Sequence, residues 1–311
     1  MRGTGHLIRA GVRTPATRST LCSAMFDLNK QLADIQKSGK SIIEKKEMCI
    51  KLGLRPRDVE YLEFTGFFEG KCLTFGVEIE CFANPTQVRR FASRNELSIA
   101  YEGYNHRDND HYYKFVSDSS VRGLADPIEC VSPVLKDNTD GHGSLKKCLK
   151  TLNEAGAQVN ESCGLHVHVG VEEYTDEEYI NIFKNYQKLE LLIDSFMAPS
   201  RRGECQWARS LQRFDYDPCR LKIDVQATMR SRYFKVNPES YGRHKTVEFR
   251  QHQGTVNYKK ISMWVNFCLK LVDWSKNNTF TSRIDTIDDI PFLNDEEKRF
   301  FKSRKNHFQG A

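Results

Sequence analysis

The chain has 311 residues, of which 39% are hydrophobic and 28% are charged, a composition typical of a globular protein with a substantial core. The formal net charge of +6 is modest and acidic residues are interleaved with the basic ones, so we expect no nucleic-acid footprint. No stretch approaches the ~18–20 apolar residues that would span a membrane.

The cysteines are scattered along the chain, and none of them forms a CxxC pair. This spacing argues against a zinc knuckle or a thioredoxin-type redox motif. Free thiols beside apolar positions behave as small hydrophobic side chains. Since there is also no secretory apolar segment, we expect a reducing, cytoplasmic environment.

The N-terminal region divides into two predicted parts. Residues 1–24 contain four arginines and no acid, and we expect this segment to be disordered. Its composition resembles an organellar transit peptide, and it equally fits a segment upstream of the true start, because Met25 opens a helical sequence. Residues 25–70 are predicted to form a helical extension, with a second short helix from Leu52 to Leu62.

Residues 71–275 carry the periodic patterns of a larger domain. Alternating or short apolar runs predict strands at residues 73–82, 112–116, 128–131, 165–171 and 246–251. Helical spacing of apolar residues predicts helices at residues 85–97, 145–156, 175–196 and 261–272. The third of these helices begins with a capping box, formed by Thr175 and Glu178. Residues 276–311 are predicted to be a tail with a short helix capped by Asn294.

Three of the predicted strands share a polar–apolar–polar pattern: Glu78-Ile79-Glu80, His166-Val167-His168 and Glu248-Phe249-Arg250. Residues two apart on a strand point to the same face, about 7 Å from each other. Each strand therefore presents two ionisable side chains on one face and apolar side chains on the other. Three such strands predict a shared concave site whose apolar back packs on helices.

Each pattern alone is ambiguous. An ExE or ExR pair is more often a solvated surface, and HxH is balanced between a metal site and a structural pair. Together they predict a hard-cation site, because carboxylates suit Mg²⁺ or Mn²⁺ and a nearby arginine suits a phosphoryl group. The chain has no P-loop, no GxGxxG and no GxSxG. A Cys163–His166 nucleophile pair is disfavoured, because residues three apart on a strand point to opposite faces.

Several segments, in order, resemble the amidoligase family of glutamine-synthetase-like carboxylate–amine ligases. The clearest are Thr74-Phe-Gly-Val-Glu-Ile-Glu80, Cys163-Gly-Leu-His-Val-His-Val169 and Thr246-Val-Glu-Phe-Arg-Gln-His-Gln-Gly-Thr255. Weaker matches lie at residues 116–120, 128–133, 198–202 and 232–237, so that the resemblance covers about residues 72–275. It implies an α+β fold with a curved antiparallel sheet flanked by helices, and it implies ATP and two or three divalent cations, Mg²⁺ or Mn²⁺.

The resemblance also assigns roles to residues. It implies metal ligands at Glu78, Glu80, Glu129, His166 and Glu248, with the ExE pair split between two cations. It places Arg250 against the transferred phosphate and makes Glu248 and His168 candidates for catalytic roles. Candidates for binding nucleotide phosphate or a substrate carboxylate are Arg201, Arg202 and Arg232. Asp118 is a candidate for holding substrate or metal.

The implied reaction joins a small-molecule or peptide carboxylate to an amine through an acyl phosphate. Two alternatives stay open at this point. One is a metal-dependent hydrolase that uses the HxH motif with Glu248 or Glu129. The other is a non-catalytic binding protein that retains the fold.

Overall fold

The computed structural model describes residues 28, 30–32, 34–35, 42–64, 72–103, 109 and 111–309. The chain divides into two compact units, Met1–Cys72 and Leu73–Ala311. The prediction for residues 1–24 falls outside the described residues. Across the described part of the chain, no helix is long and apolar enough to cross a membrane.

The first unit contains α2 (Ile42–Lys51) and α3 (Pro56–Phe64). The turn between them passes through Gly53, whose φ of +90° is a conformation that side chains rarely adopt. Proline opens α3, where its missing N–H costs no helical hydrogen bond. The unit buries its own small apolar cluster, formed by Leu32, Ile35, Cys49, Leu54, Val59 and Leu62.

The second unit is built on an eight-stranded sheet, which confirms the predicted α+β class. Its strands are β1 (Thr74–Phe82), β2 (Ile99–Tyr101), β3 (Tyr113–Ser117), β4 (Pro127–Val131), β5 (Leu135–Lys136), β6 (Gly164–Gly170), β7 (Val236–Asn237) and β8 (Thr246–Gln253). The order across the sheet is β2-β3-β4-β1-β6-β8-β7, and β5 pairs with β1. All pairings are antiparallel except that of β2 with β3.

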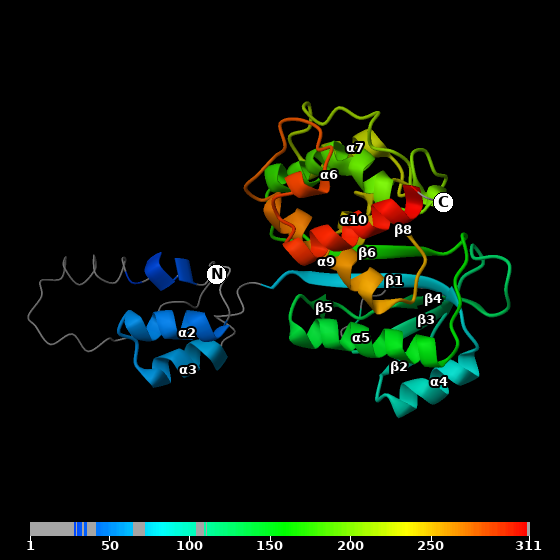
Figure 1. Ribbon diagram of the computed structural model, residues 1–311, viewed down its shortest axis with the longest axis horizontal. Coiled ribbons are helices and arrows are strands. Elements are labelled where there is room, and N and C mark those ends of the chain that lie inside the picture. Colours follow the sequence, from blue (N-terminus) through cyan, green and yellow to red (C-terminus); the bar gives the residue numbers. More distant parts are fainter. Residues whose placement is uncertain are drawn as a thin grey trace, which may run out of the picture. The chain divides into compact units, whose positions relative to one another are not determined.

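Helices flank this sheet (Figure 1). They are α4 (Pro85–Arg94), α5 (Thr139–Glu154), α6 (Asp176–Phe196), α7 (Lys222–Met229), α8 (Ser240–His244), α9 (Tyr258–Trp274) and α10 (Asp295–Gln309), with short 3₁₀ turns η2 (Pro199–Arg201) and η3 (Ile287–Asp289). The predicted capping box starts α6: Thr175 Oγ1 accepts from the Glu178 N–H, and the Glu178 carboxylate accepts from the Thr175 N–H. This fixes the first turn of the longest helix.

One face of the sheet forms the core. On β1 and β6 the odd-numbered residues, such as Val77, Ile79 and Val167, are fully buried in the main apolar cluster. The same cluster takes in Leu149 of α5 and Trp264 of α9. The alternation of these strands therefore directs their even-numbered side chains to the opposite face.

The segment after Ser275 carries the helix that the sequence predicted for it. Asn294 caps α10 as expected, since its Oδ1 accepts from the Glu297 N–H. The helix then runs for 15 residues. Its Phe301 packs against Phe196 and Phe267, with ring centroids 4.8 and 5.5 Å away, so the segment belongs to the main core.

Candidate metal and catalytic centre

Strand register brings the predicted site residues into rows on the face opposite the core. Glu78 of β1 lies opposite His166 of β6, and Glu80 lies opposite Glu129 of β4. On the other side of β6, His168 lies opposite Glu248 of β8. Directly opposed residues point to the same face with their Cβ atoms about 5 Å apart, so the rows concentrate carboxylates and imidazoles in one place.

A cavity of about 480 Å³ opens on these rows. All the predicted site residues except Arg202 line it. Within it, two groups of three side chains each have ligand atoms within 4.8 Å of one another: Glu78, His168 and Glu248, and Glu80, Asp118 and Glu129. The ExE pair of β1 thus contributes one carboxylate to each group.

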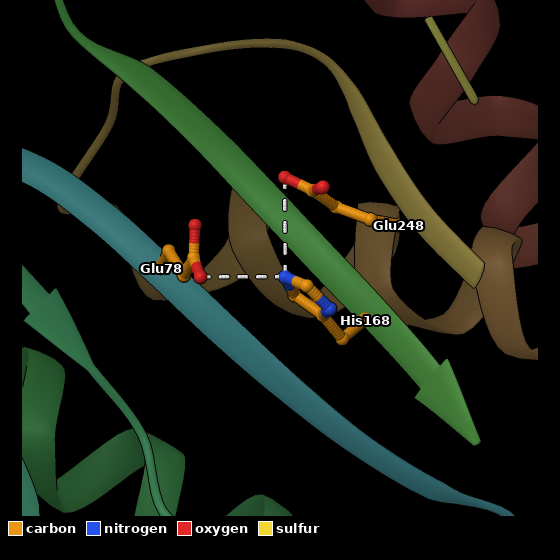
Figure 2. Close-up of side chains that lie close together, drawn as sticks. All are labelled: Glu78, His168 and Glu248. Carbon is orange, nitrogen blue, oxygen red and sulfur yellow. Dashed lines mark ion pairs between the residues drawn. The ribbon is translucent and has the colours of Figure 1, made fainter. Parts of the chain in front are cut away.

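Figure 2 shows the first group, with the imidazole of His168 between the two carboxylates. His168 Nε2 lies 3.4 Å from Glu78 Oε1 and 3.9 Å from Glu248 Oε1. The other nitrogen, Nδ1, lies 3.0 Å from Thr246 Oγ1, which orients the ring. Nε2 is buried and has no well-aligned hydrogen-bond partner among the described residues. A buried, unpartnered nitrogen between two carboxylates fits a cation ligand.

His166 lies close to carboxylates of both groups. Its Nδ1 lies 2.9 Å from Glu78 Oε2 and 3.5 Å from Glu248 Oε1, and its Nε2 lies 3.8 Å from Glu80 Oε1. The imidazole therefore stands between the two groups. Both imidazoles thus lie beside Glu78 and Glu248, so His166 stays a candidate ligand together with His168.

The second group gathers around Glu80. Its Oε2 accepts a hydrogen bond of 2.5 Å from the Gly164 N–H, which holds one oxygen in place. A Cβ at Gly164 would lie 3.0 Å from His166 Nε2 and 3.3 Å from that same Glu80 oxygen. A side chain here would therefore press on His166 and Glu80, which favours glycine at the close approach of β6 to the site. Asp118, just beyond β3, completes this group with Glu129.

Burial and the crowding of acidic side chains shift the pKa values of several residues in these groups. Burial raises the pKa of Glu129 well above its usual range, and the surrounding carboxylates, Glu78 first, raise it further. Burial would also raise the pKa of Glu78, but the adjacent imidazoles of His166 and His168 hold it well below the usual value. Burial lowers the pKa of His168, and the carboxylates of Glu78 and Glu248 more than offset this, so the net shift is upward.

The Arg250 side chain is held in place by a neighbour on the same strand, β8. Its NH1 donates to Glu248 Oε1, two residues away on the same face, and Glu248 Oε2 accepts from Asn237 Nδ2 of β7. Arg250 Nε is buried without a hydrogen-bond partner among the described residues. Its guanidinium carbon lies 5.7 Å from the ring centroid of Tyr233. A buried arginine with an unused donor suits an incoming anion.

A β-bulge shapes this part of β8. Leu165 pairs with His252 and Val167 with Phe249, so Arg250 and Gln251 together oppose the single residue His166. Gln251 accepts from the Tyr186 hydroxyl and His252 stacks 5.7 Å from Trp264, so two successive side chains face the helices. Strict alternation, which the sequence suggested, therefore holds only as far as Arg250.

The three other predicted arginines differ in position. Arg201, at the end of η2, is buried and lines the cavity while its NH2 donates to Cys163 O at 2.7 Å. Arg232 is exposed at the cavity wall, 5.4 Å from the Tyr233 ring. Arg202 does not line the cavity, since its Nε donates to Met197 O and its guanidinium lies 5.4 Å from the Phe308 ring. We therefore leave Arg202 out of the proposed site.

A buried ion cluster behind the sheet was not predicted. Lys235 is fully buried, and its Nζ lies 2.8 Å from Glu190 Oε1 and 2.7 Å from Asp194 Oδ1, both on α6. Asp194 also accepts from Gln251 and from the Gly203 N–H. The cluster thus ties the segment after η2 to the strand that carries Arg250. The sequence contained one sign of this cluster: Glu190 and Asp194 lie four residues apart on the apolar side of a predicted helix.

Comparison with known proteins identifies the family. A family model described as "Putative amidoligase enzyme" matches residues 71–272, which is more than half of the chain. No curated protein matches the sequence. The matched segment contains both groups of candidate ligands and Arg250, and family membership indicates ligase activity. The chain belongs to this amidoligase family.

Proposed function

We propose that this chain is an ATP-dependent carboxylate–amine ligase that binds two divalent cations, Mg²⁺ or Mn²⁺. The observation that carries the proposal is the pair of three-residue ligand groups facing one cavity, with Arg250 beside the first group. Two cations and an arginine next to each other are what phosphoryl transfer requires.

The side chains present fit such cations. Five of the six ligands are carboxylates, and oxygen donors suit Mg²⁺ or Mn²⁺ better than zinc. His168 Nε2 has no well-aligned hydrogen bond among the described residues, and the pKa of Glu129 is raised, both of which a bound cation would offset. When bound, the cations would neutralise charge on the phosphates.

The proposed reaction has two steps. A carboxylate oxygen of the acid substrate attacks the γ-phosphorus of ATP, the bond to ADP breaks, and an acyl phosphate forms. The amine then attacks the acyl carbon, phosphate leaves, and the amine gives up a proton. In this scheme the Arg250 guanidinium stabilises the transferring phosphoryl group. His166, which stands between the two ligand groups, is positioned to accept the proton.

The hydrolase alternative has less support. A zinc hydrolase of the HxH type would draw both imidazoles into one ligand set. Both imidazoles do lie beside Glu78 and Glu248, but the two ligand groups together hold five carboxylates and one imidazole, a donor set that suits a hard cation better than zinc. Zinc that survives dialysis, with no nucleotide binding, would favour the hydrolase.

The first test of the function is a search for condensation. Purified protein with ATP and Mg²⁺ is incubated with pooled carboxylates and amines, and products are read by mass together with ADP release. We expect ADP release that depends on both a carboxylate and an amine and gives a product heavier by their sum less water. Turnover of ATP to ADP with no condensed product from any pool would contradict the ligase assignment.

Removing one carboxylate from either group should weaken the coupling between metal binding and nucleotide binding. We expect Glu78→Gln and Glu80→Gln each to lower the affinity for MgATP by at least ~10-fold, because even outer-sphere partners of metal sites are worth about that much. Folding should be retained, since the change removes repulsion between clustered acids. Calorimetric titration of Mn²⁺ with and without ATP measures the coupling.

Glu172→Gln provides the matched control for these two variants, because Glu172 is an exposed acid in the turn that follows β6. It should bind metal and nucleotide as the wild type does. If Glu78→Gln and Glu80→Gln also behave like the wild type, these two carboxylates are not ligands.

Metal binding should release protons, because a ligand must be deprotonated to coordinate. The pKa of Glu129 lies well above the usual carboxyl range without metal, so metal affinity should fall as the pH drops through that raised pKa. Titrations at one pH in buffers of different ionisation enthalpy give the number of protons released. Glu129→Gln should reduce that number, whereas an unchanged number would show that Glu129 is not the proton source.

A further inference from the structure

The η2 turn, which brings Arg201 to the cavity, is held from strand β8 at two points. Gln253 Oε1 accepts a hydrogen bond of 3.2 Å from the Ala198 N–H, just before the turn. Gln251 Nε2 donates a hydrogen bond of 3.2 Å to the carbonyl of Arg201 itself. Both glutamines belong to the strand that also carries Arg250. The position of Arg201 is therefore tied to that of Arg250.

The two arginines serve different ligand groups. Arg250 donates to Glu248, a member of the first group. A Cβ at Gly164 would lie 3.3 Å from Glu80 Oε2 and 3.5 Å from Arg201 NH1, so Arg201 faces the second group. Anions that engage both groups would meet one guanidinium at each. The separation of the two guanidinium groups therefore bears on how the reacting atoms are aligned.

Gln251 joins the two arginines from behind the site. It is completely buried and does not line the cavity, and its Nε2 donates to Asp194 Oδ1 as well as to the Arg201 carbonyl. Asp194 Oδ1 also lies 2.7 Å from Lys235 Nζ. The Lys235 carbonyl in turn accepts a hydrogen bond of 2.9 Å from the Arg250 N–H. One amide thus closes a ring of contacts that runs from the η2 turn to the backbone of Arg250.

A buried amide in this layer calls for a reason beyond packing, because an apolar side chain of similar size would fill the space without the cost of burying polar atoms. We infer that Gln251 is a positioning residue, which sets the separation of the Arg201 and Arg250 guanidinium groups without touching a substrate. This inference rests on the proposed function and deepens it, since it names the side chain that holds the two arginines in register.

Gln251→Met tests the inference, because methionine fills a similar space and cannot donate to the Arg201 carbonyl. The probe is magnesium tripolyphosphate, titrated calorimetrically, since it offers phosphates to both groups and needs no acid or amine. We expect affinity to fall roughly 10-fold, the usual size for a residue that orients ligands from behind. Arg201→Lys should lower it by a similar factor. The double variant should bind within about twofold of Arg201→Lys alone, because Gln251 acts through Arg201.

Tyr186→Phe is the matched control. The Tyr186 hydroxyl donates to Gln251 Oε1, so this change also removes a buried hydrogen bond of Gln251. The two acceptors of Nε2, Asp194 Oδ1 and the Arg201 carbonyl, still hold the amide in place. Both single variants should melt below the wild type, but Tyr186→Phe should keep its affinity for tripolyphosphate within about twofold. Equal losses of affinity in the two variants would overturn the inference.

The remaining outcomes separate the inference from the proposed function. Wild-type affinity in a folded Gln251→Met protein, or losses that add fully in the double variant, would overturn the inference alone. Wild-type protein that binds neither tripolyphosphate nor MgATP would reject the proposed function, and the inference with it. If Gln251→Met does not fold, Gln253→Met releases the other end of the same turn from a half-buried position and should also weaken binding. Unchanged binding in that variant would then overturn the inference.

Discussion

Arg250→Lys should lower turnover by roughly 10²–10³-fold, the size expected when one electrostatic stabiliser of a transition state is removed. Lysine keeps the positive charge and loses the planar fork that can bind two phosphoryl oxygens. Arg250 is 4% exposed, donates to Glu248 and keeps Nε unpartnered within the described structure, so the fork has a donor available for the transferring group. Binding of ATP should weaken far less than turnover, because the interaction forms mainly in the transition state.

Positional isotope exchange in ATP, measured once a carboxylate substrate is found, reports the phosphoryl transfer step directly. Arg213→Lys is the matched control, because Arg213 pairs with Glu204 at an exposed position. It should exchange at the wild-type rate, and melting curves should show both variants folded. An Arg250→Lys protein that is folded and exchanges as fast as the wild type would assign Arg250 a structural role as the partner of Glu248.

Lys235→Met should lower the free energy of unfolding by about 3–5 kcal/mol, the usual cost of breaking a buried ion pair from one side. Lys235 is completely buried, and the change would leave Glu190 and Asp194 without their cation inside the protein. The acids keep backbone donors, from Leu211 and Gly203 respectively, which are too few to replace the lost charge. The loss is a large fraction of the stability of an ordinary domain.

Urea unfolding followed by circular dichroism measures the change, provided that the slope of the transition is the same in both proteins. Lys302→Met is the control: it removes the same side chain from a pair with Asp288 at an exposed position. Exposed pairs contribute about 0–1 kcal/mol, so this variant should unfold near the wild-type midpoint. Equal effects of the two substitutions would show that burial adds nothing to the Lys235 cluster.

The parts of the site that could be predicted are those that follow from strand period. Because residues two apart share a face, the ExE, HxH and ExR patterns were enough to place Glu78, His168, Glu248 and Arg250 on one surface. The α+β class followed from the family resemblance and from strands and helices of clear periodicity. The long helix α6 was predicted from its apolar spacing and its capping box.

The parts that could not be predicted depend on register and on tertiary contacts. How the two imidazoles of the HxH motif lie about Glu78 and Glu248 depends on the orientation of their rings, and Thr246 sets that of His168. The bulge at Arg250–Gln251 has no marker in local sequence, since it arises from pairing with β6. The short elements β2, β5, β7 and α8 have too few residues to show a period. Arg202, adjacent in sequence to Arg201, points elsewhere because it packs on α10.

The two ligand groups differ in how far apart their members lie along the chain. Glu80, Asp118 and Glu129 come from β1, the end of β3 and β4, and β4 pairs with both β1 and β3. The group of Glu78 and His168 is completed only by Glu248 of β8, which follows Glu78 by more than half of the chain. During synthesis all three members of the acidic group leave the ribosome before Glu248 does, and the shorter loops between them cost less closure entropy. We therefore expect the acidic group to form first and the histidine-containing group to be completed only when β8 pairs with β6.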